Sequence, residues 1–229
     1  MRICVRCMCV VLAVGSLGFG AELSQAQSVR GRSGAGESPK VKRVAIPDFP
    51  GTFAIWGATG RDSRGHIWFG VCGHDMANPT GHLFELIPST GKVIDRGDLI
   101  SALKSNGVYR EGELQMKIHS KIFQVGEYMY FCSMDEKDED MEKEKLPTWG
   151  SHMWRLRLTD GTWEHLKTTK DALIGMAAGG KYVYALGYNR HALHQYETAT
   201  GKTRRVEVGA IGGHISRGLL ADGRGHVYV

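Results

Sequence analysis

Two histidines in similar sequence surroundings are the first candidates for chemistry. His119 lies in segment 117–121 and His214 in segment 214–217, and each segment leads into a stretch rich in aromatic residues. A neutral imidazole can ligate a metal ion or move a proton near neutral pH. We therefore predict His119 and His214 as catalytic residues. The alternative is a structural role, in which the two imidazoles satisfy buried backbone groups.

Charged and hydroxyl side chains surround these histidines. Lys117, Ser120 and Arg217 are predicted as ligand-binding residues, since Lys117 and Arg217 could hold a carboxylate or a sulfate. The alternative is that they are rim charges in water. A divalent metal ion is one cofactor that the histidines could hold, but the spacing assigns no ligand set. The sequence has no nucleophile elbow, phosphate loop or His-Glu-x-x-His zinc motif, which excludes the commonest hydrolase, nucleotide-binding and metalloprotease classes.

The remaining histidines and an acidic segment give weaker signals. His82 and His152 each directly precede a repeated unit and are expected to serve a turn. His74 and Asp75 pair a base with a carboxylate, but adjacent side chains of an extended chain point to opposite sides. Segment 135–145 is rich in acidic residues without the calcium-loop pattern, so a solvated charged loop is expected.

Cys72 and Cys132 are the cysteines that follow the N-terminal apolar run. An exported protein meets an oxidising compartment, in which a disulfide could form. Equivalent strands of stacked sheets lie about 10 Å apart, whereas a disulfide needs Cα atoms within about 7 Å. We therefore expect two buried free thiols, with a disulfide as the alternative.

An internal repeat must position these residues. Four segments place Gly shortly before an aromatic residue, and the anchors are Trp68, Tyr130, Tyr184 and Tyr228. After each of the first three anchors comes a unit that begins with an apolar residue and ends with Gly eight positions later, at 83–91, 153–161 and 193–201. Glycine there supplies the positive φ of a hairpin corner.

The interval between anchors is that of a four-stranded propeller blade with loop insertions. We predict an all-β fold, a β-propeller with about three and a half blades in this chain, as a fragment of a six- or seven-bladed ring. An irregular open β-sheet is the alternative. One short helix is expected over 98–104, where Asp98 is the N-cap.

Composition supports this organisation. The chain has 229 residues, 42% hydrophobic, with 31 Gly and 6 Pro, which fits one mainly β domain. Residues 1–26 are predicted to be a signal peptide, 27–43 a disordered basic linker and 44–229 the partial propeller. Residues 44–229 carry 22 basic and 22 acidic residues, so the folded part is neutral and nucleic-acid binding is not expected.

The blade motifs resemble a known family. The pattern Gly-x-Ile-Trp-Phe at 65–69, followed by Leu-x-x-Leu-x-Pro-x-Thr-Gly-Lys at 83–92, resembles the blades of streptogramin lyase (virginiamycin B lyase-like) propellers. It resembles gluconolactonase-like and NHL-type propellers more loosely. The resemblance covers about residues 54–229. It implies a propeller with a ligand site in its central funnel. Streptogramin lyases commonly carry Thr-Glu after the Trp-Phe pair, whereas Gly70 and Val71 follow here.

These observations lead to a functional expectation. We expect a protein exported to the periplasm or the extracellular space, without a membrane span after signal cleavage, whose funnel binds a small-molecule or carbohydrate-like ligand. One alternative is a lyase or lactone hydrolase of the same architecture that uses a divalent ion and a histidine base. A second alternative is a cell-surface scaffold for protein partners. The sequence leaves the ligand, the blade number and the oligomeric state open.

Overall fold

Short runs of apolar and aromatic residues, separated by Gly-containing turns, make this chain a succession of short antiparallel strands. The computed structural model describes residues 41–75, 77, 79–140, 142–143, 145–187, 191–209 and 218–229. Residues Arg43–Val229 form one compact unit. The predicted signal peptide and all but the last three residues of the predicted linker lie outside the described residues.

Each of the first three sheets is a meander of consecutive antiparallel strands. The first sheet contains β1 (Thr52–Ala54), β2 (Thr59–Arg61), β3 (Ile67–Gly73), β4 (His82–Ile87) and β5 (Lys92–Asp98). The second contains β6 (Lys117–Ile118), β7 (Phe123–Val125), β8 (Tyr128–Met134), β9 (Ser151–Arg157) and β10 (Trp163–Thr169). The third contains β11 (Leu173–Gly179), β12 (Tyr182–Gly187), β13 (Ala192–Glu197) and β14 (Thr203–Glu207). Strands β15 (Leu220–Ala221) and β16 (Val227–Tyr228) pair as a fourth, two-stranded sheet.

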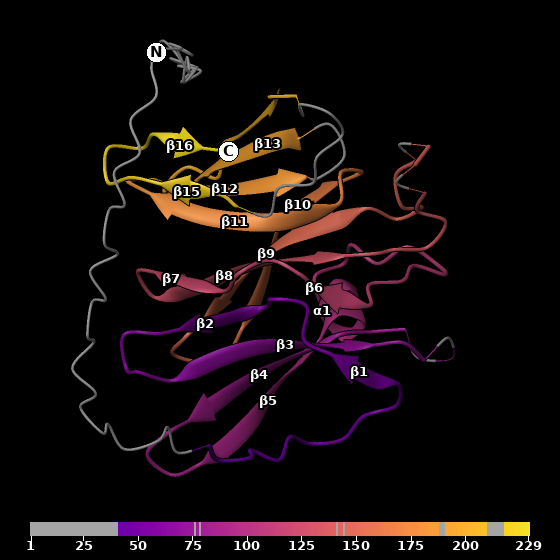
Figure 1. Cartoon of the computed structure of the whole chain (residues 1–229), viewed down its shortest axis with the longest axis vertical. Helices are drawn as coiled ribbons and strands as arrows, with labels where there is room; N and C mark the ends of the chain where they lie inside the picture. The colour runs from indigo at the N-terminus through magenta and orange to yellow at the C-terminus, as the bar shows by residue number, and fades with distance from the viewer. Residues whose placement is uncertain are drawn as a thin grey trace, which may run out of the picture. The chain divides into compact units, whose positions relative to one another are not determined.

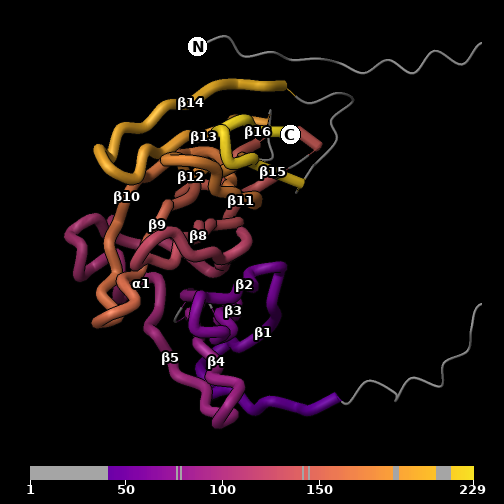
Figure 2. The backbone as a smooth tube through the Cα atoms, turned by 90° about the vertical axis from the view of Figure 1, so that its left-hand side faces the viewer, coloured from indigo at the N-terminus to yellow at the C-terminus, as the bar shows by residue number. Residues whose placement is uncertain are grey.

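The sheets are propeller blades. In the first two blades, two short strands pair with the same neighbour, β1 and β2 with β3, and β6 and β7 with β8, so each pair forms one interrupted inner strand. Contacts between blades join these inner positions, from β2 and β3 to β7 and β6, and from β8 to β11. Figures 1 and 2 show the blades following one another in chain order. The predicted all-β propeller architecture is therefore confirmed, and the size of the complete ring stays a prediction.

The repeated units of the sequence, which end with Gly eight positions after their first residue, are the third strand of each blade and the turn that follows it. Gly91, Gly161 and Gly201 have φ of 72°, 76° and 70°. Their backbone N–H groups donate to Ile87 O, Arg157 O and Glu197 O, which occupy the same position in each unit. These turns need the left-handed backbone that glycine adopts without steric cost. The predicted role of these glycines is confirmed.

Three of the four aromatic anchors, Trp68, Tyr130 and Tyr184, are buried in cores between blades, whereas Tyr228 is exposed. Trp68 of the first blade packs in a cluster with Ile118 and Trp154 of the second. Tyr130 of the second blade packs in a cluster with Met176 of the third. A blade buries both sheet faces against its neighbours, which explains why these strands are apolar on both faces.

The predicted short helix exists as α1 (Leu99–Ser105), directly after β5. The side chain of Asp98 accepts from the Ser101 N–H at 2.9 Å, as an N-cap does. Leu99, Ala102 and Leu103 are buried between the first two blades. No helix in the described part of the chain is long and apolar enough to cross a membrane.

The two cysteines are free and buried, as the sequence predicted. Burial raises the pKa of the Cys72 thiol to about 12. Cys132 lies on the face of the second blade that packs against the third. Both thiols therefore act as small apolar core groups.

Inner strands of neighbouring blades approach so closely that a side chain has no room. A Cβ atom added to Gly60 in β2 would lie 1.8 Å from the backbone oxygen of Ile122. The Ile122 N–H donates to Thr59 O at 3.1 Å, so main chain meets main chain here. A Cβ atom on Gly179 in β11 would lie 2.4 Å from Asp222 O. Glycine at these positions allows the blades to stack.

We predict that Gly60→Ala separates the first two blades locally. Its free energy of unfolding should fall by about 1–3 kcal/mol, which is typical of overpacking at a site that cannot give way. Urea denaturation followed by tryptophan fluorescence would measure this. The matched control is Gly223→Ala, where an added Cβ meets nothing within 4 Å. Equal stabilities of the two variants would contradict the argument.

Candidate functional site

The inner strands of the first two blades are interrupted at the same level. Between β1 and β2, Gly57 has φ of 103°, and its carbonyl accepts from the Thr59 N–H at 2.9 Å, which turns residues 55–58 out of the strand. Between β6 and β7, residues 119–122 also leave the ladder. The interruptions bring Trp56 and His119 together, with ring centroids 6.3 Å apart and ring planes inclined by 10°.

Two exposed aromatic rings form what we call the aromatic platform, Phe53 and Trp56. Phe53 is 60% exposed and Trp56 is 37% exposed, and their ring centroids lie 6.3 Å apart. The ring of His74, in the loop after β3, stacks on Phe53 at 4.5 Å. The platform leaves apolar ring surface open to solvent, and a contiguous exposed apolar patch can mark a ligand-binding site.

A carboxylate from the second blade joins charged groups beside the platform. Glu136 follows β8, and its carboxylate forms an ion pair with the Lys117 ammonium and lies 3.2 Å from His74 Nε2. The Lys117 ammonium also lies 4.8 Å from the centre of the Trp56 ring, within cation–π distance. These residues meet because β1 and β6 begin beside the last residues of β3 and β8, where Thr52 pairs with Gly73 and Lys117 pairs with Met134.

Glu139 is a second carboxylate in this loop, and its pKa is strongly perturbed. Burial, together with the nearby carboxylates of Glu136 and Asp135, raises its pKa to about 7, although Lys117 acts in the opposite direction. Its Oε1 atom is buried and accepts no hydrogen bond from a described residue. A carboxyl group that titrates near neutral pH can exchange a proton with a ligand.

We name these seven residues the inner-strand site. They come from two inner strands and from the loops after β3 and β8: Phe53, Trp56, His74, Lys117, His119, Glu136 and Glu139.

The structure brings two of the sequence-predicted residues into this site. His119 is 6% exposed and Lys117 lies on β6, where the sequence placed the funnel lining. Ser120 is fully buried, and its hydroxyl accepts from Cys132 N at 2.8 Å and donates to Lys121 O at 3.1 Å. That hydroxyl is engaged in the fold. The predicted roles of His119, Lys117 and Ser120 in catalysis and binding stay predictions.

The predicted residues His214 and Arg217 lie outside the described residues. Their segment precedes β15, which belongs to the fourth sheet. The predicted correspondence between His119 and His214 therefore stays a prediction.

The sequence predicts that the acidic loop that follows β8 is solvated. In the structure, the start of this loop is buried instead. Asp135 is fully buried, and its carboxylate accepts from the backbone N–H groups of Lys137 and Trp149 at 2.8 and 2.9 Å. Burial raises the pKa of Asp135 in spite of these hydrogen bonds. The anchored start of the loop places the Glu136 carboxylate beside Lys117 and His74.

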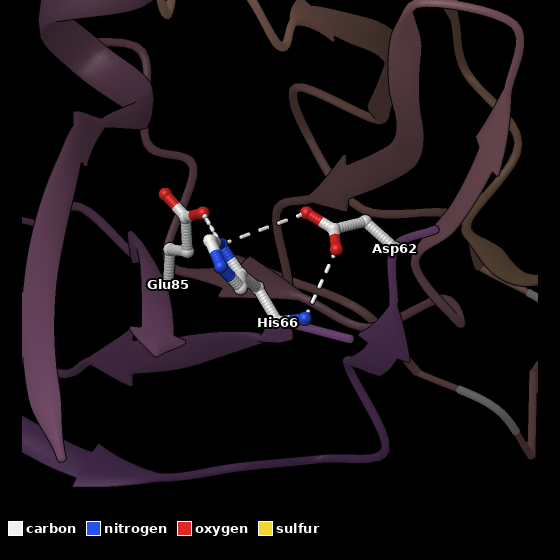
Figure 3. Close-up of side chains that lie close together, drawn as sticks. All are labelled: Asp62, His66 and Glu85. Carbon is white, nitrogen blue, oxygen red and sulfur yellow. Dashed lines mark hydrogen bonds and ion pairs between the residues drawn. The ribbon is translucent and has the colours of Figure 1, made fainter. Parts of the chain in front are cut away.

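A cluster in the first blade has the residue types of a metal site. Asp62, His66 and Glu85 each offer a ligand atom within 4.8 Å of the others, and Figure 3 shows the His66 ring between the two carboxylates. Both carboxylates already have cationic partners. Arg64 Nη2 donates to Asp62 Oδ2 at 2.6 Å and to Glu85 Oε1 at 3.0 Å, and Arg96 Nε donates to Glu85 Oε2 at 2.7 Å. The arrangement is a neutralised ion-pair network.

The repeat explains this cluster. Asp62 Oδ1 accepts from the backbone N–H groups of Arg64 and His66, which closes the turn between β2 and β3. Asp222 makes the same two contacts with Arg224 and His226 in the fourth sheet, both at 2.9 Å. The Asp-x-Arg-Gly-His sequence is therefore a structural turn. Among the described residues, no other group of three potential metal ligands lies this close together.

His152, which the sequence assigned to a turn, lies in a buried polar chain instead. Its Nε2 atom is 2.8 Å from Glu113 Oε1 and its Nδ1 atom is 2.9 Å from His165 Nε2. Burial would raise the pKa of Glu113, but hydrogen bonds from His152 and Arg110 lower it to about 2. Burial and the neighbouring His152 lower the pKa of His165 to about 4. These hydrogen-bonded side chains connect the loop after α1 to β9 and β10.

Comparisons with known proteins assign no family. No family model matches the sequence, and no curated protein matches it. Solved structures with a similar arrangement include the extracellular domain of BT4673 from B. thetaiotaomicron, at 12% identity and a TM-score of 0.49 over 76% of this chain and 19% of that one. TolB from Acinetobacter baumannii matches at 11% identity and a TM-score of 0.41, over 67% of this chain and 32% of TolB. An oligogalacturonate lyase in complex with manganese matches at 10% identity and a TM-score of 0.43, over 70% and 42%.

This chain therefore spans less than half of each of these proteins. The propeller architecture rests on the chain's own sheets, and the resemblance to streptogramin lyases stays a prediction.

Sequence reasoning missed the aromatic platform and the inward carboxylates. Phe53 and Trp56 lie shortly before Gly57 in the sequence. Two aromatic residues shortly before a glycine are the signal that could have identified the platform. Glu136 and Glu139 lie in a segment whose composition is typical of a solvated loop, so the sequence did not single them out. Nothing in their spacing distinguishes them from their exposed neighbours.

We predict that Glu139→Gln stabilises the protein at high pH. The folded pKa of about 7 exceeds the unfolded value of about 4.5, so the folded state binds more protons between these values. Stability is therefore lost as pH rises through that window, and a neutral amide avoids the loss. The free energy of urea unfolding should be higher for Glu139→Gln than for the wild type at pH 8 and similar at pH 4.

Glu142→Gln is the matched control, because Glu142 is an exposed glutamate of the same loop. It should show no such pH-dependent gain. A gain for Glu139→Gln that is equal at both pH values would mean that the carboxylate does not titrate there.

Proposed function

We propose that this chain is part of an exported β-propeller whose inner-strand site binds a carbohydrate-like ligand. The observation that carries the proposal is the exposed aromatic platform of Phe53 and Trp56, with ionisable groups from two blades at its border. Export is inferred from the basic start and apolar run of residues 1–26.

The chemistry of the site supports a sugar. One face of a sugar ring presents C–H groups that pack on an aromatic ring, while its hydroxyl groups donate and accept hydrogen bonds. Trp56 and Phe53 supply the flat apolar surface. Glu136 and Glu139 supply acceptors, and His74 supplies a ring nitrogen. Ligand sites of this kind combine an apolar wall with a few convergent polar groups.

A metal-dependent lyase or lactone hydrolase receives less support. The described residues contain one cluster with metal-ligand composition, and its carboxylates are neutralised by Arg64 and Arg96. Such an enzyme would need ligands from outside the described residues, such as His214. The experiment below distinguishes a protein-interaction scaffold from a sugar-binding site.

We predict that Trp56→Ala weakens sugar binding by about tenfold, the loss of roughly 1.4 kcal/mol of stacking. Isothermal titration calorimetry of the full chain with maltohexaose, cellohexaose, xylohexaose and N-acetylchitohexaose would measure this. Tyr228→Ala is the matched control, since Tyr228 is an exposed aromatic residue of the fourth sheet. It should leave the affinity unchanged.

Two results would oppose the proposal. Absence of binding to all four hexasaccharides would reject a carbohydrate site of this type. Binding that survives Trp56→Ala would place the sugar elsewhere on the protein. Capture of a protein partner that depends on Trp56, without any sugar binding, would favour the scaffold.

A further inference from the structure

Two histidine rings of the second blade face each other across neighbouring strands. His152 lies on β9 and His165 on β10, and the Nδ1 atom of His152 is 2.9 Å from the Nε2 atom of His165. The Thr168 hydroxyl oxygen is 3.3 Å from each of these nitrogens. Two nitrogens and one oxygen, all of them able to ligate a metal ion, therefore form a small triangle.

The triangle has the size of one side of a metal coordination sphere. When each metal–nitrogen bond is about 2.0–2.1 Å long, two nitrogen ligands of one ion lie about 2.9 Å apart at a right angle and about 3.4 Å apart at the tetrahedral angle. The three edges of 2.9, 3.3 and 3.3 Å fall within this range. One ion placed over the triangle would contact both imidazoles and the hydroxyl.

Glu113 orients His152 for this role. Arg110 Nη2 donates to Glu113 Oε1 at 2.6 Å, and the same oxygen lies 2.8 Å from His152 Nε2. An ionised carboxylate can only accept a hydrogen bond, so the neutral His152 ring carries its proton on Nε2 and directs the Nδ1 lone pair at the triangle. A carboxylate on the far nitrogen of a histidine is the usual partner that orients a metal-bound ring.

The repeat shows that the second blade departs from the first at this position. The corresponding residues of the first blade, one position before the repeated unit and four positions after its glycine, are His82 and Asp95. His82 Nδ1 lies 3.0 Å from Asp95 Oδ2, so an imidazole there faces a carboxylate. In the second blade an imidazole stands in place of the carboxylate, and two ring nitrogens face each other. A metal ion is a partner that accepts a lone pair from both.

The triangle is accessible from one side. His152 is fully buried, His165 is partly exposed and Thr168 is exposed. An ion can therefore reach the nitrogens past Thr168, and water can occupy its remaining coordination positions. Burial and the neighbouring His152 lower the pKa of His165 to about 4, which keeps this ring in the neutral form that ligates metal at pH 7.

We propose that His152 Nδ1, His165 Nε2 and the Thr168 hydroxyl bind a divalent late transition-metal ion, such as Ni²⁺ or Zn²⁺, that bridges β9 and β10. Imidazole nitrogens suit these ions, whereas Mg²⁺ and Ca²⁺ prefer oxygen ligands. The site has two histidine ligands, with a hydroxyl and water completing the set. It belongs to the third and fourth strands of the blade, so it does not depend on the proposed sugar binding.

Calorimetry of the full chain with Ni²⁺ and with Zn²⁺ at pH 7 tests the proposal. His165→Gln removes one of the two ring nitrogens and should weaken binding at this site by at least about tenfold, the loss that follows removal of an outer partner of a metal ligand. Thr168→Val removes the hydroxyl from an exposed position and should weaken binding to a smaller extent. His82→Gln is the matched control from the equivalent position of the first blade, and it should leave the affinity within about twofold.

Nitrogen NMR of the imidazole rings identifies the ligand atoms among all the groups of the chain. Addition of Zn²⁺ to the ¹⁵N-labelled protein should shift the resonances of His152 Nδ1 and His165 Nε2. Because Zn²⁺ at this site binds the folded state, it should also raise the urea midpoint of the wild type and of His82→Gln, but not that of His165→Gln. Mg²⁺ at the same concentration should cause neither effect.

Three results would overturn the proposal. The first is Zn²⁺ binding that leaves the His165 Nε2 resonance unchanged, which would place the metal on other groups. The second is equal affinity of the wild type and His165→Gln. If His165→Gln does not fold, the wild-type spectra and Thr168→Val decide, and ring nitrogens that do not respond to either metal would show that the pair is only a hydrogen bond of the polar chain.

Discussion

The close approach of neighbouring inner strands is the constraint on which this structure depends. Gly60 stands where a Cβ atom would collide with the main chain of the next blade, and Gly179 repeats this between later blades. Because backbone meets backbone, the Ile122 N–H can donate across the junction to Thr59. The large side chains of the second strands, Trp68 and Tyr130, then fill the space between the sheets. Small residues at the inner edge and large residues further out give the blades their stacking.

The same constraint produces the inner-strand site. Where the inner strands leave the ladder, at 55–58 and 119–122, Ala58 and Ile122 stay in the core between the sheets, whereas Trp56 leaves it. Trp56 is therefore turned partly to solvent, and His119 lies beside it. The loops after β3 and β8 end at the same side and add His74 and Glu136. A site made from several blades has residues far apart in sequence, although the fold itself is a local repeat.

Cationic partners distinguish three buried carboxylates of the fold from Glu139. The buried carboxylates of Asp62 and Glu113 each accept from an arginine, and Asp171 accepts from Arg205 and His194 in the third blade. These pairings lower the pKa of each of the three carboxyl groups. Glu139 has no such cationic hydrogen-bond partner among the described residues, and its pKa is raised. This contrast, rather than the number of acidic residues, distinguishes the inner-strand site from the ion-pair network at Asp62.

The sequence by itself determined the repeat, the all-β class, the glycine turns and the short helix with its Asp98 cap. These features depend on local periodicity and on the backbone preferences of single residues, which a linear pattern contains. It also predicted Lys117 and His119 on an inner strand, and the structure has Lys117 on β6 and His119 directly after that strand. Only the tertiary structure decided that Lys117 is neutralised by Glu136, that Asp62 and Glu85 are structural, and that His152 is buried in a polar chain. Those outcomes depend on which groups from different blades come within a few ångströms, and distance along the chain does not specify that.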